Sequence, residues 1–194
     1  MDKSAIIEQN ISESIALKTS LLSDNAIIEL IVEVSDLIVD VYRKKGKVLF
    51  CGNGGSAADA QHLAAELSGR YYYDRPPLFA EALHVNTSYL TAVANDYSYD
   101  DIYARLLDAI AIEGDVLIGL STSGNSKNVV KAFQKAKELN LMTIAFTGKG
   151  GGDMKPFSDY ILEIPSTDTP RIQECHMLIG HSICQVVEQE LFPQ

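Results

Sequence analysis

The chain has 194 residues and a formal net charge of −10, with 46% hydrophobic and 22% charged residues. This length favours one domain with a sizeable core, and the composition is typical of a globular protein. The acidic balance argues against nucleic acid or an anionic membrane as a direct partner. No apolar run is long enough to span a bilayer and the first residues do not form a signal peptide, so a cytoplasmic protein is expected.

Two helices are predicted before the first strand. Apolar residues recur at helical spacing over residues 6–22 and again over residues 27–41, with a break and cap signal at residues 23–25. Gly46 ends the second helix. We treat residues 1–45 as an N-terminal helical extension, and its wide apolar faces favour packing against another subunit.

From residue 47 onward, strand and helix signals alternate. Strands are expected at residues 47–51, 78–84, 115–120, 142–146 and 160–164, and helices at residues 56–68, 87–94, 100–112, 127–139 and 171–191. This alternation predicts a parallel sheet with helices on both faces. The fold class is therefore α/β, a three-layer αβα domain over residues 1–194 with a five-stranded parallel core at residues 46–194 and a long C-terminal helix. The cysteines, Cys51, Cys175 and Cys184, lack metal-type spacing and are expected to be reduced core residues.

A glycine-rich turn separates the first predicted strand from its helix. Its residues are Gly52-Asn53-Gly54-Gly55-Ser56. Glycines let the backbone approach a ligand closely, Ser56 is the expected N-cap, and free N–H groups at the helix start favour an anion. Gly52, Gly54 and Ala57 also fit a dinucleotide fingerprint, but the acidic residue expected at the end of the next strand is missing. A purely structural turn is the other alternative.

A second turn, Ser121-Thr122-Ser123-Gly124-Asn125-Ser126, follows the most apolar strand and opens a helix. It presents hydroxyl and N–H groups at the edge where open α/β sheets bind ligands, which predicts a phosphate site. It is not a Walker loop, because no lysine followed by serine or threonine comes after a glycine there. The alternative is an ordinary serine-rich loop with one capping residue.

Two helices carry side chains that suit a metal ion. His62 and Glu66 are four residues apart and share one helix face. Gln173 and His181 are eight residues apart on the final helix, with a rise of about 12 Å between them. Each of these residues alone is more often a surface residue or a satisfied core histidine. Together they form a nitrogen- and oxygen-rich set that suits zinc.

Several motifs resemble those of the bacterial phosphoheptose isomerases, which belong to the SIS superfamily. The motifs are CGNGGSAADAQH, AELSGR, AND, STSGNS, TGKGGG and RIQECH, and they cover nearly the whole chain in family order. The resemblance implies a flavodoxin-like SIS fold and a homotetramer with one Zn²⁺ per subunit. It also implies conversion of sedoheptulose 7-phosphate to D-glycero-D-manno-heptose 7-phosphate through an enediolate. That reaction is the first step toward ADP- or GDP-heptose for lipopolysaccharide or capsule.

The same resemblance assigns roles to individual residues. Glu66 and His181 would be the acid/base pair, with Glu66 removing the carbon-bound proton and His181 handling the oxygen protons. The zinc ligands would be His62, Glu66, Gln173 and His181. The substrate contacts would come from Asn53, Gly54, Gly55, Ser56, Glu66, Asn95, Asp96, Ser121, Thr122, Ser123, Ser126 and Gln173.

Two functions without catalysis stay open within the same superfamily. One is a DnaA-binding protein of replication initiation, which keeps the fold and lacks the acid/base pair. The other is a sugar-phosphate sensor that binds without turnover. The presence of both Glu66 and His181 favours the enzyme.

Overall fold

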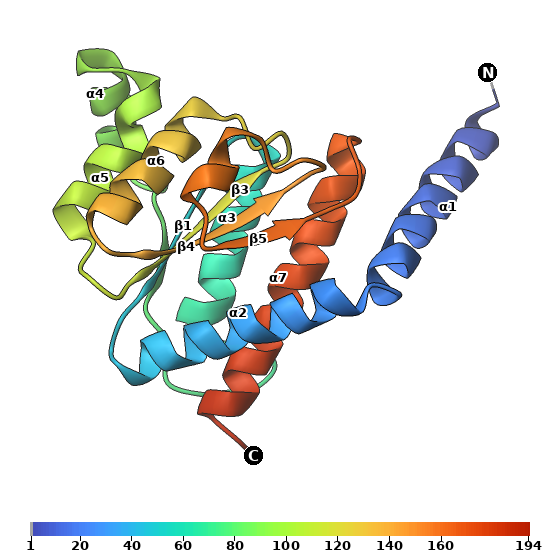
Figure 1. Ribbon diagram of the computed structural model, residues 1–194, viewed down its shortest axis with the longest axis horizontal. Coiled ribbons are helices and arrows are strands. Elements are labelled where there is room, and N and C mark those ends of the chain that lie inside the picture. The colour runs from blue at the N-terminus through green and yellow to red at the C-terminus, as the bar shows by residue number, and fades with distance from the viewer. Residues whose placement is uncertain (1) are drawn as a thin grey trace.

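Five strands form one parallel sheet in the order β2-β1-β3-β4-β5 in the computed structural model, which describes residues 2–194 (Figure 1). The strands are β1 (Val48–Gly52), β2 (Ala80–Ala82), β3 (Val116–Ser121), β4 (Met142–Thr147) and β5 (Tyr160–Glu163). This is the flavodoxin-like order, in which the strand sequence reverses between β1 and β3. The predicted α/β fold class is confirmed.

Helices cover both faces of the sheet. They are α1 (Lys3–Leu22), α2 (Asn25–Arg43), α3 (Gly55–Ser68), α4 (Thr87–Asp96), α5 (Ile102–Ile110), α6 (Lys127–Glu138) and α7 (Thr169–Leu191), with short 3₁₀ helices η1 (Tyr99–Asp101) and η2 (Gly152–Phe157). Buried side chains of α2, α3 and α7 share one core with the sheet, and those of α4, α5 and α6 share the other. The architecture is therefore three-layered.

The apolar run of β1 shows why the sheet is buried on both faces. Val48 and Phe50 belong to the core beneath α2, α3 and α7, whereas Leu49 and Cys51 belong to the core beneath α5 and α6. Side chains alternate between the two faces of a strand, so a strand covered on both sides must be apolar throughout. Cys51, like Cys175 and Cys184, is a free and buried thiol, as predicted.

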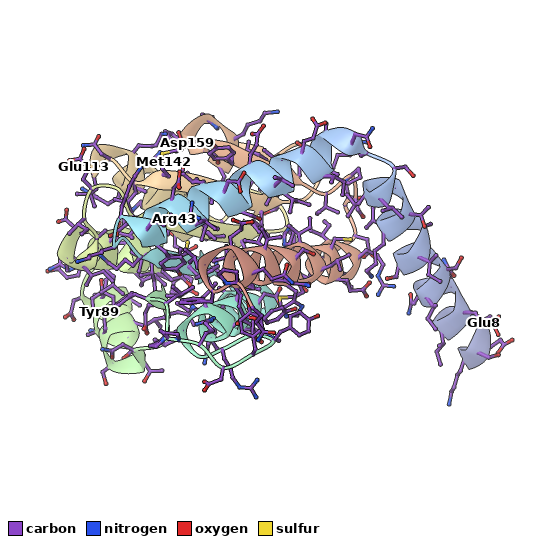
Figure 2. The ribbon with its side chains drawn as sticks, turned by 90° about the horizontal axis from the view of Figure 1, so that it is seen from below. Glu8, Arg43, Tyr89, Glu113, Met142 and Asp159 are labelled. Carbon is purple, nitrogen blue, oxygen red and sulfur yellow. The ribbon has the colours of Figure 1, made fainter. Side chains whose placement is uncertain are left out.

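The two N-terminal helices differ in their relation to this core. Helix α2 buries Val34 and Ile38 completely, so it is one of the layer helices as well as part of the predicted extension. Figure 2 shows α2 and α7 side by side, and α1 leaving the body at an angle with Glu8 near its far end. The middle of α1 is joined to α7 by a hydrogen bond of 2.6 Å from Ser14 Oγ to Glu174.

Some element boundaries differ from those expected. Strand β2 has three residues, Ala80–Ala82, where residues 78–84 were predicted. Helix α7 begins at Thr169 because Pro170 lies in its first turn, where its missing N–H group costs no helical hydrogen bond. The 3₁₀ helix η2 was not predicted. Among residues 2–194, no helix is both long and apolar enough to cross a membrane.

Candidate active site

The two ligand-type turns lie next to each other at one edge of the sheet. Strands β1 and β3 are hydrogen-bonded neighbours, and Gly52 at the end of β1 pairs with Leu120 near the end of β3. The glycine-rich turn and the serine turn (residues 121–126) therefore leave the sheet together, at the point where the strand order reverses. Open α/β sheets bind their ligands at such a point.

The glycine-rich turn leads directly into α3. Gly54 is the N-cap at a φ of 57°, so the prediction that Ser56 caps the helix is wrong. Ser56 lies in the first helical turn, is buried, and accepts a long hydrogen bond of 3.4 Å from Gln173 Nε2. A Cβ atom at Gly55 would lie 2.7 Å from Gln173 Nε2, so the missing side chain at Gly55 leaves room for the Gln173 amide.

Asn53 links the glycine-rich turn to the start of α6, the helix that follows the serine turn. Its side-chain amide exchanges two hydrogen bonds of 2.8 Å with the amide of Asn128 in the first turn of α6. The hydroxyl of Tyr99 also donates to Asn53 Oδ1 at 3.1 Å. The orientation of the Asn53 side chain is therefore determined by residues of two other segments.

Two backbone N–H groups from the region after β4 donate hydrogen bonds to carbonyls of the serine turn. Met154 N–H donates to the carbonyl of Gly124, and Gly148 N–H donates to that of Thr122, each at 3.0 Å. The Oγ atoms of Ser121 and Ser126 lie 3.0 Å apart, so Ser126 makes no side-chain cap of α6. The N–H groups of Lys127 and Asn128 are thus left for a ligand and favour an anion, whereas that of Val129 donates to Asn128 Oδ1 at 3.0 Å.

His62, Glu66 and His181 come together between α3 and α7. Glu66 Oε1 lies 2.9 Å from His62 Nε2, and His181 Nε2 lies 3.3 Å from the same nitrogen. The helices can approach this closely because Gly180 faces Leu63: a Cβ atom at Gly180 would lie 2.5 Å from a Leu63 methyl carbon. The predicted proximity of these three residues is what the structure shows.

The electrostatics of this cluster favour a neutral imidazole at position 181. Burial lowers the pKa of His181 below its usual value, and the neighbouring His62 lowers it further, against the opposing effect of Glu66. A neutral ring has a free lone pair on one nitrogen, and that nitrogen can accept a proton or bind a metal ion.

The donor set fits a zinc ion. One ligand atom from each of His62, Glu66 and His181 lies within 4.8 Å of the others. Two nitrogens bound tetrahedrally to one Zn²⁺ at about 2.0–2.1 Å are separated by about 3.3 Å. The spacing of 3.3 Å between the two Nε2 atoms matches that separation. Gln173, the fourth predicted ligand, is hydrogen-bonded to Ser56 instead.

Two further predicted contact residues, Asn95 and Asp96, lie on α4. Asn95 and Asp96 are exposed at the end of α4, where Asn95 Nδ2 donates to Asp96 Oδ1 at 2.9 Å.

Three residues that shape the site were not predicted from the sequence: Asn128, Gly180 and Tyr71. Only Gly180 left a signal, because a glycine inside an apolar helix indicates close packing.

The profile of the SIS domain family matches residues 14–148. The chain is thus an SIS-domain protein. It is 52% identical to the phosphoheptose isomerase of Clostridium acetobutylicum, over 96% of this chain and 95% of that protein. It is 50% identical to that of Mycobacterium tuberculosis, over 95% and 94%. The solved structure of the phosphoheptose isomerase from Neisseria gonorrhoeae superposes with a TM-score of 0.91, at 39% identity, over 97% of this chain and all of that one. The chain belongs to the phosphoheptose isomerase family, which confirms the resemblance found in its motifs.

Proposed function

We propose that this protein is an aldose–ketose isomerase that converts sedoheptulose 7-phosphate to D-glycero-D-manno-heptose 7-phosphate. The observation that carries the proposal is the placement of the serine turn, with its free helix N–H groups, at the same sheet edge as the start of α3, the helix that bears His62 and Glu66. A sugar phosphate bound in that turn would extend toward the cluster of His62, Glu66 and His181. The product would supply heptose precursors for lipopolysaccharide or capsule.

In this proposal, Glu66 performs the carbon chemistry. Its carboxylate takes a proton from C1 of the ketose, which leaves an enediolate, and returns a proton to C2 of the aldose. His181 donates a proton to the oxygen on C2 and accepts one from the oxygen on C1, so the reaction is balanced. The lowered pKa of His181 favours the neutral ring, and a neutral imidazole offers one N–H donor and one acceptor nitrogen for this exchange.

Binding residues would hold the substrate so that its C1 atom meets Glu66. Ser121, Thr122, Ser123 and Ser126 would contact the phosphate. The sugar would be bound by Asn53, Gly54, Gly55, Ser56 and Gln173, and Asn95 and Asp96 remain predicted contacts. The Asn53–Asn128 pair supports this arrangement, because it fixes Asn53, a proposed sugar-binding residue, relative to the helix that follows the serine turn.

A zinc ion would be held by His62, Glu66 and His181, with Gln173 as the predicted fourth ligand. When bound, it would polarise the substrate carbonyl and stabilise negative charge on the reacting oxygens. The donor set and the spacing of its nitrogens support one such ion per subunit.

The proposal includes a homotetramer in the cytoplasm. Helix α1 supports an oligomer, because it projects from the body with exposed apolar side chains, as Figure 1 shows for the helix as a whole. These side chains are Ile6, Ile7, Ile11, Ile15 and Leu22. A run of exposed apolar residues on one helix is typical of an interaction surface.

The direct test is incubation of the purified, zinc-loaded protein with sedoheptulose 7-phosphate, followed by NMR detection of an aldose anomeric proton. We expect the signal of the aldose anomeric proton to appear with the zinc-loaded protein. It should not appear when the metal has been removed by a chelator before the substrate is added. Binding of the sugar phosphate without product would contradict the proposal and support the sensor. Absence of both, with stoichiometric capture of DnaA, would support the replication protein.

A further inference from the structure

The imidazole of His181 contacts two aromatic rings. The ring of Tyr71 stacks on it, with centroids 5.7 Å apart and planes at 25°. The ring of His62 meets it edge-on, with centroids 5.0 Å apart and planes at 64°. Tyr71 belongs to the loop between α3 and β2, and its side chain is half-buried against the core. The ring that bears the proposed acid/base nitrogen is thus restricted by a loop residue.

That loop is anchored by a buried carboxylate on α7. Glu188 accepts hydrogen bonds from the backbone N–H groups of Tyr71 and Tyr72, at 2.9 and 2.7 Å. It also accepts one from Arg75 Nε at 3.0 Å. The side chains of Arg75 and Glu188 are each only 1% exposed. These bonds place Tyr71 at a defined position relative to the helix that carries His181.

The remaining donors of Arg75 reach the other helix of the site. Its Nη2 donates to the backbone carbonyl of Glu66 at 2.8 Å, and its Nη1 donates to that of Leu67 at 2.7 Å. Nη1 also contacts the carbonyls of Gly69 and Pro76, both at 3.1 Å. The carbonyls of Glu66 and Leu67 lie in the last turn of α3, where backbone carbonyls have no partner within the helix. One buried ion pair therefore connects the segment that carries Glu66 with the helix that carries His181.

The charges of this pair are well compensated. Burial by itself would raise the pKa of Glu188, but the two backbone N–H groups and Arg75 outweigh it and hold the pKa below its usual value. The cost of removing two charges from water offsets much of their attraction, so a buried ion pair is weak evidence for stability. What the hydrogen bonds of this pair do is define the positions of the groups that they join. The arrangement that it defines here includes the Tyr71 ring.

We propose that Tyr71 is a positioning residue for His181, and that the buried Arg75–Glu188 pair keeps it in place relative to α3 and α7. This inference rests on the roles proposed above for His62 and His181. The stacked ring restricts rotation of the imidazole and so maintains the 3.3 Å spacing between its Nε2 and that of His62. Groups that orient metal-binding histidines commonly change metal affinity or activity by about 10- to 100-fold when they are removed.

The test compares Tyr71→Leu with Tyr71→Phe, which keeps the flat ring. The control is Phe79→Leu, which removes an aromatic ring that is 61% exposed and lies outside the site. Co²⁺ is the probe: each chelator-stripped protein is titrated with it and followed by visible absorption, and kcat and KM are then measured on sedoheptulose 7-phosphate. For Tyr71→Leu we expect about tenfold weaker Co²⁺ binding and about tenfold lower kcat, with KM nearly unchanged. Tyr71→Phe and Phe79→Leu should behave like the wild type.

Equal Co²⁺ affinity in the wild type and in folded Tyr71→Leu would overturn the inference and leave the proposed function intact. A wild type that binds no Co²⁺ would instead overturn the metal site on which the inference rests. A fall in kcat for Tyr71→Phe as large as for Tyr71→Leu would also contradict a role for the ring face. If Tyr71→Leu does not fold, the same measurements on Tyr71→Met decide the question, because that change keeps apolar volume without a flat ring.

Discussion

Asn53 and Asn128 bind each other's side-chain amides through two hydrogen bonds of 2.8 Å, one in each direction. Asn53 belongs to the turn after β1, and Asn128 lies in the first turn of α6, after β3. Asn128 is almost completely buried, and its Oδ1 also accepts the N–H of Val129 at 3.0 Å. An amide offers both a donor and an acceptor, so each side chain satisfies the polar atoms of the other. The pair thereby joins the glycine-rich turn to the first turn of α6.

Replacing Asn128 by Asp should therefore weaken both the fold and ligand binding. The new carboxylate cannot donate to Asn53 Oδ1 and would face that oxygen in a buried position. We expect a loss of about 1–3 kcal/mol in the free energy of unfolding, measured by urea denaturation. KM for the sugar phosphate should rise, because Asn53 loses its fixed orientation. Gln134→Ala, an exposed change on the same helix, serves as the control. Unchanged stability in Asn128→Asp would show that the amide pair contributes nothing to the fold.

Glu66→Gln should stop the reaction while the protein stays folded. The amide has the shape of the carboxylate but cannot take a proton from carbon, so kcat should fall by about 10²- to 10⁴-fold or more. The melting temperature and the oligomeric state should stay close to those of the wild type. Glu190→Gln, an exposed change of the same kind on α7, should keep full activity. Wild-type turnover in Glu66→Gln would exclude Glu66 as the base.

Gly124→Ala should disrupt the serine turn more than an equivalent change elsewhere. Gly124 has a φ of 67°, and its new Cβ would lie 2.1 Å from the carbonyl oxygen of Gly151. Gly114 has a φ of 88°, with nothing within 4 Å of a new Cβ. Both changes carry the left-handed backbone cost of about 1–2 kcal/mol, but only Gly124→Ala also pushes the turn away from η2. We expect a larger drop in melting temperature and a raised KM for Gly124→Ala alone. Similar behaviour of the two variants would contradict a tight contact between these turns.

His176 should make the fold sensitive to acid. This residue is fully buried in α7, and burial lowers its pKa from 6.5 to about 4, although a contact with the Thr147 carbonyl opposes the shift. Between about pH 4 and pH 6.5, His176 binds a proton in the unfolded chain but stays neutral in the folded chain. Its contribution to stability is therefore complete above about pH 6.5 and is lost as the pH falls toward 4, by up to about 3 kcal/mol.

The measurement is urea denaturation of the wild type and of His176→Gln at pH 7.5 and pH 5. Between these pH values the wild type should lose about 2 kcal/mol more than the variant, because the variant lacks the titrating ring. The comparison uses the pH dependence and not the absolute stability, since the substitution itself alters packing. Equal losses in both proteins would show that His176 does not contribute to acid sensitivity.

Much of the site was predictable because its parts are local in sequence. The glycine-rich turn and the serine turn each follow an apolar strand within a few residues, and the pairing of His62 with Glu66 requires only the four-residue spacing of a helix. The prediction of Ser56 as a cap was wrong because helix α3 begins one residue before it, with Gly54 as the cap. Cap residues and helix ends are decided by backbone angles that composition does not specify.

By itself, the sequence determined the elements, their order, the parallel sheet and the residue types available at its carboxyl edge. These follow from short-range periodicity and from backbone preferences, which act over a few residues. Tertiary structure alone decided that His62 and His181 lie 3.3 Å apart, that Asn128 binds Asn53, and that Tyr71 covers His181. Those distances depend on how closely α3, α6, α7 and the Tyr71 loop pack. The packing is governed by contacts such as Gly180 against Leu63, between residues more than a hundred positions apart.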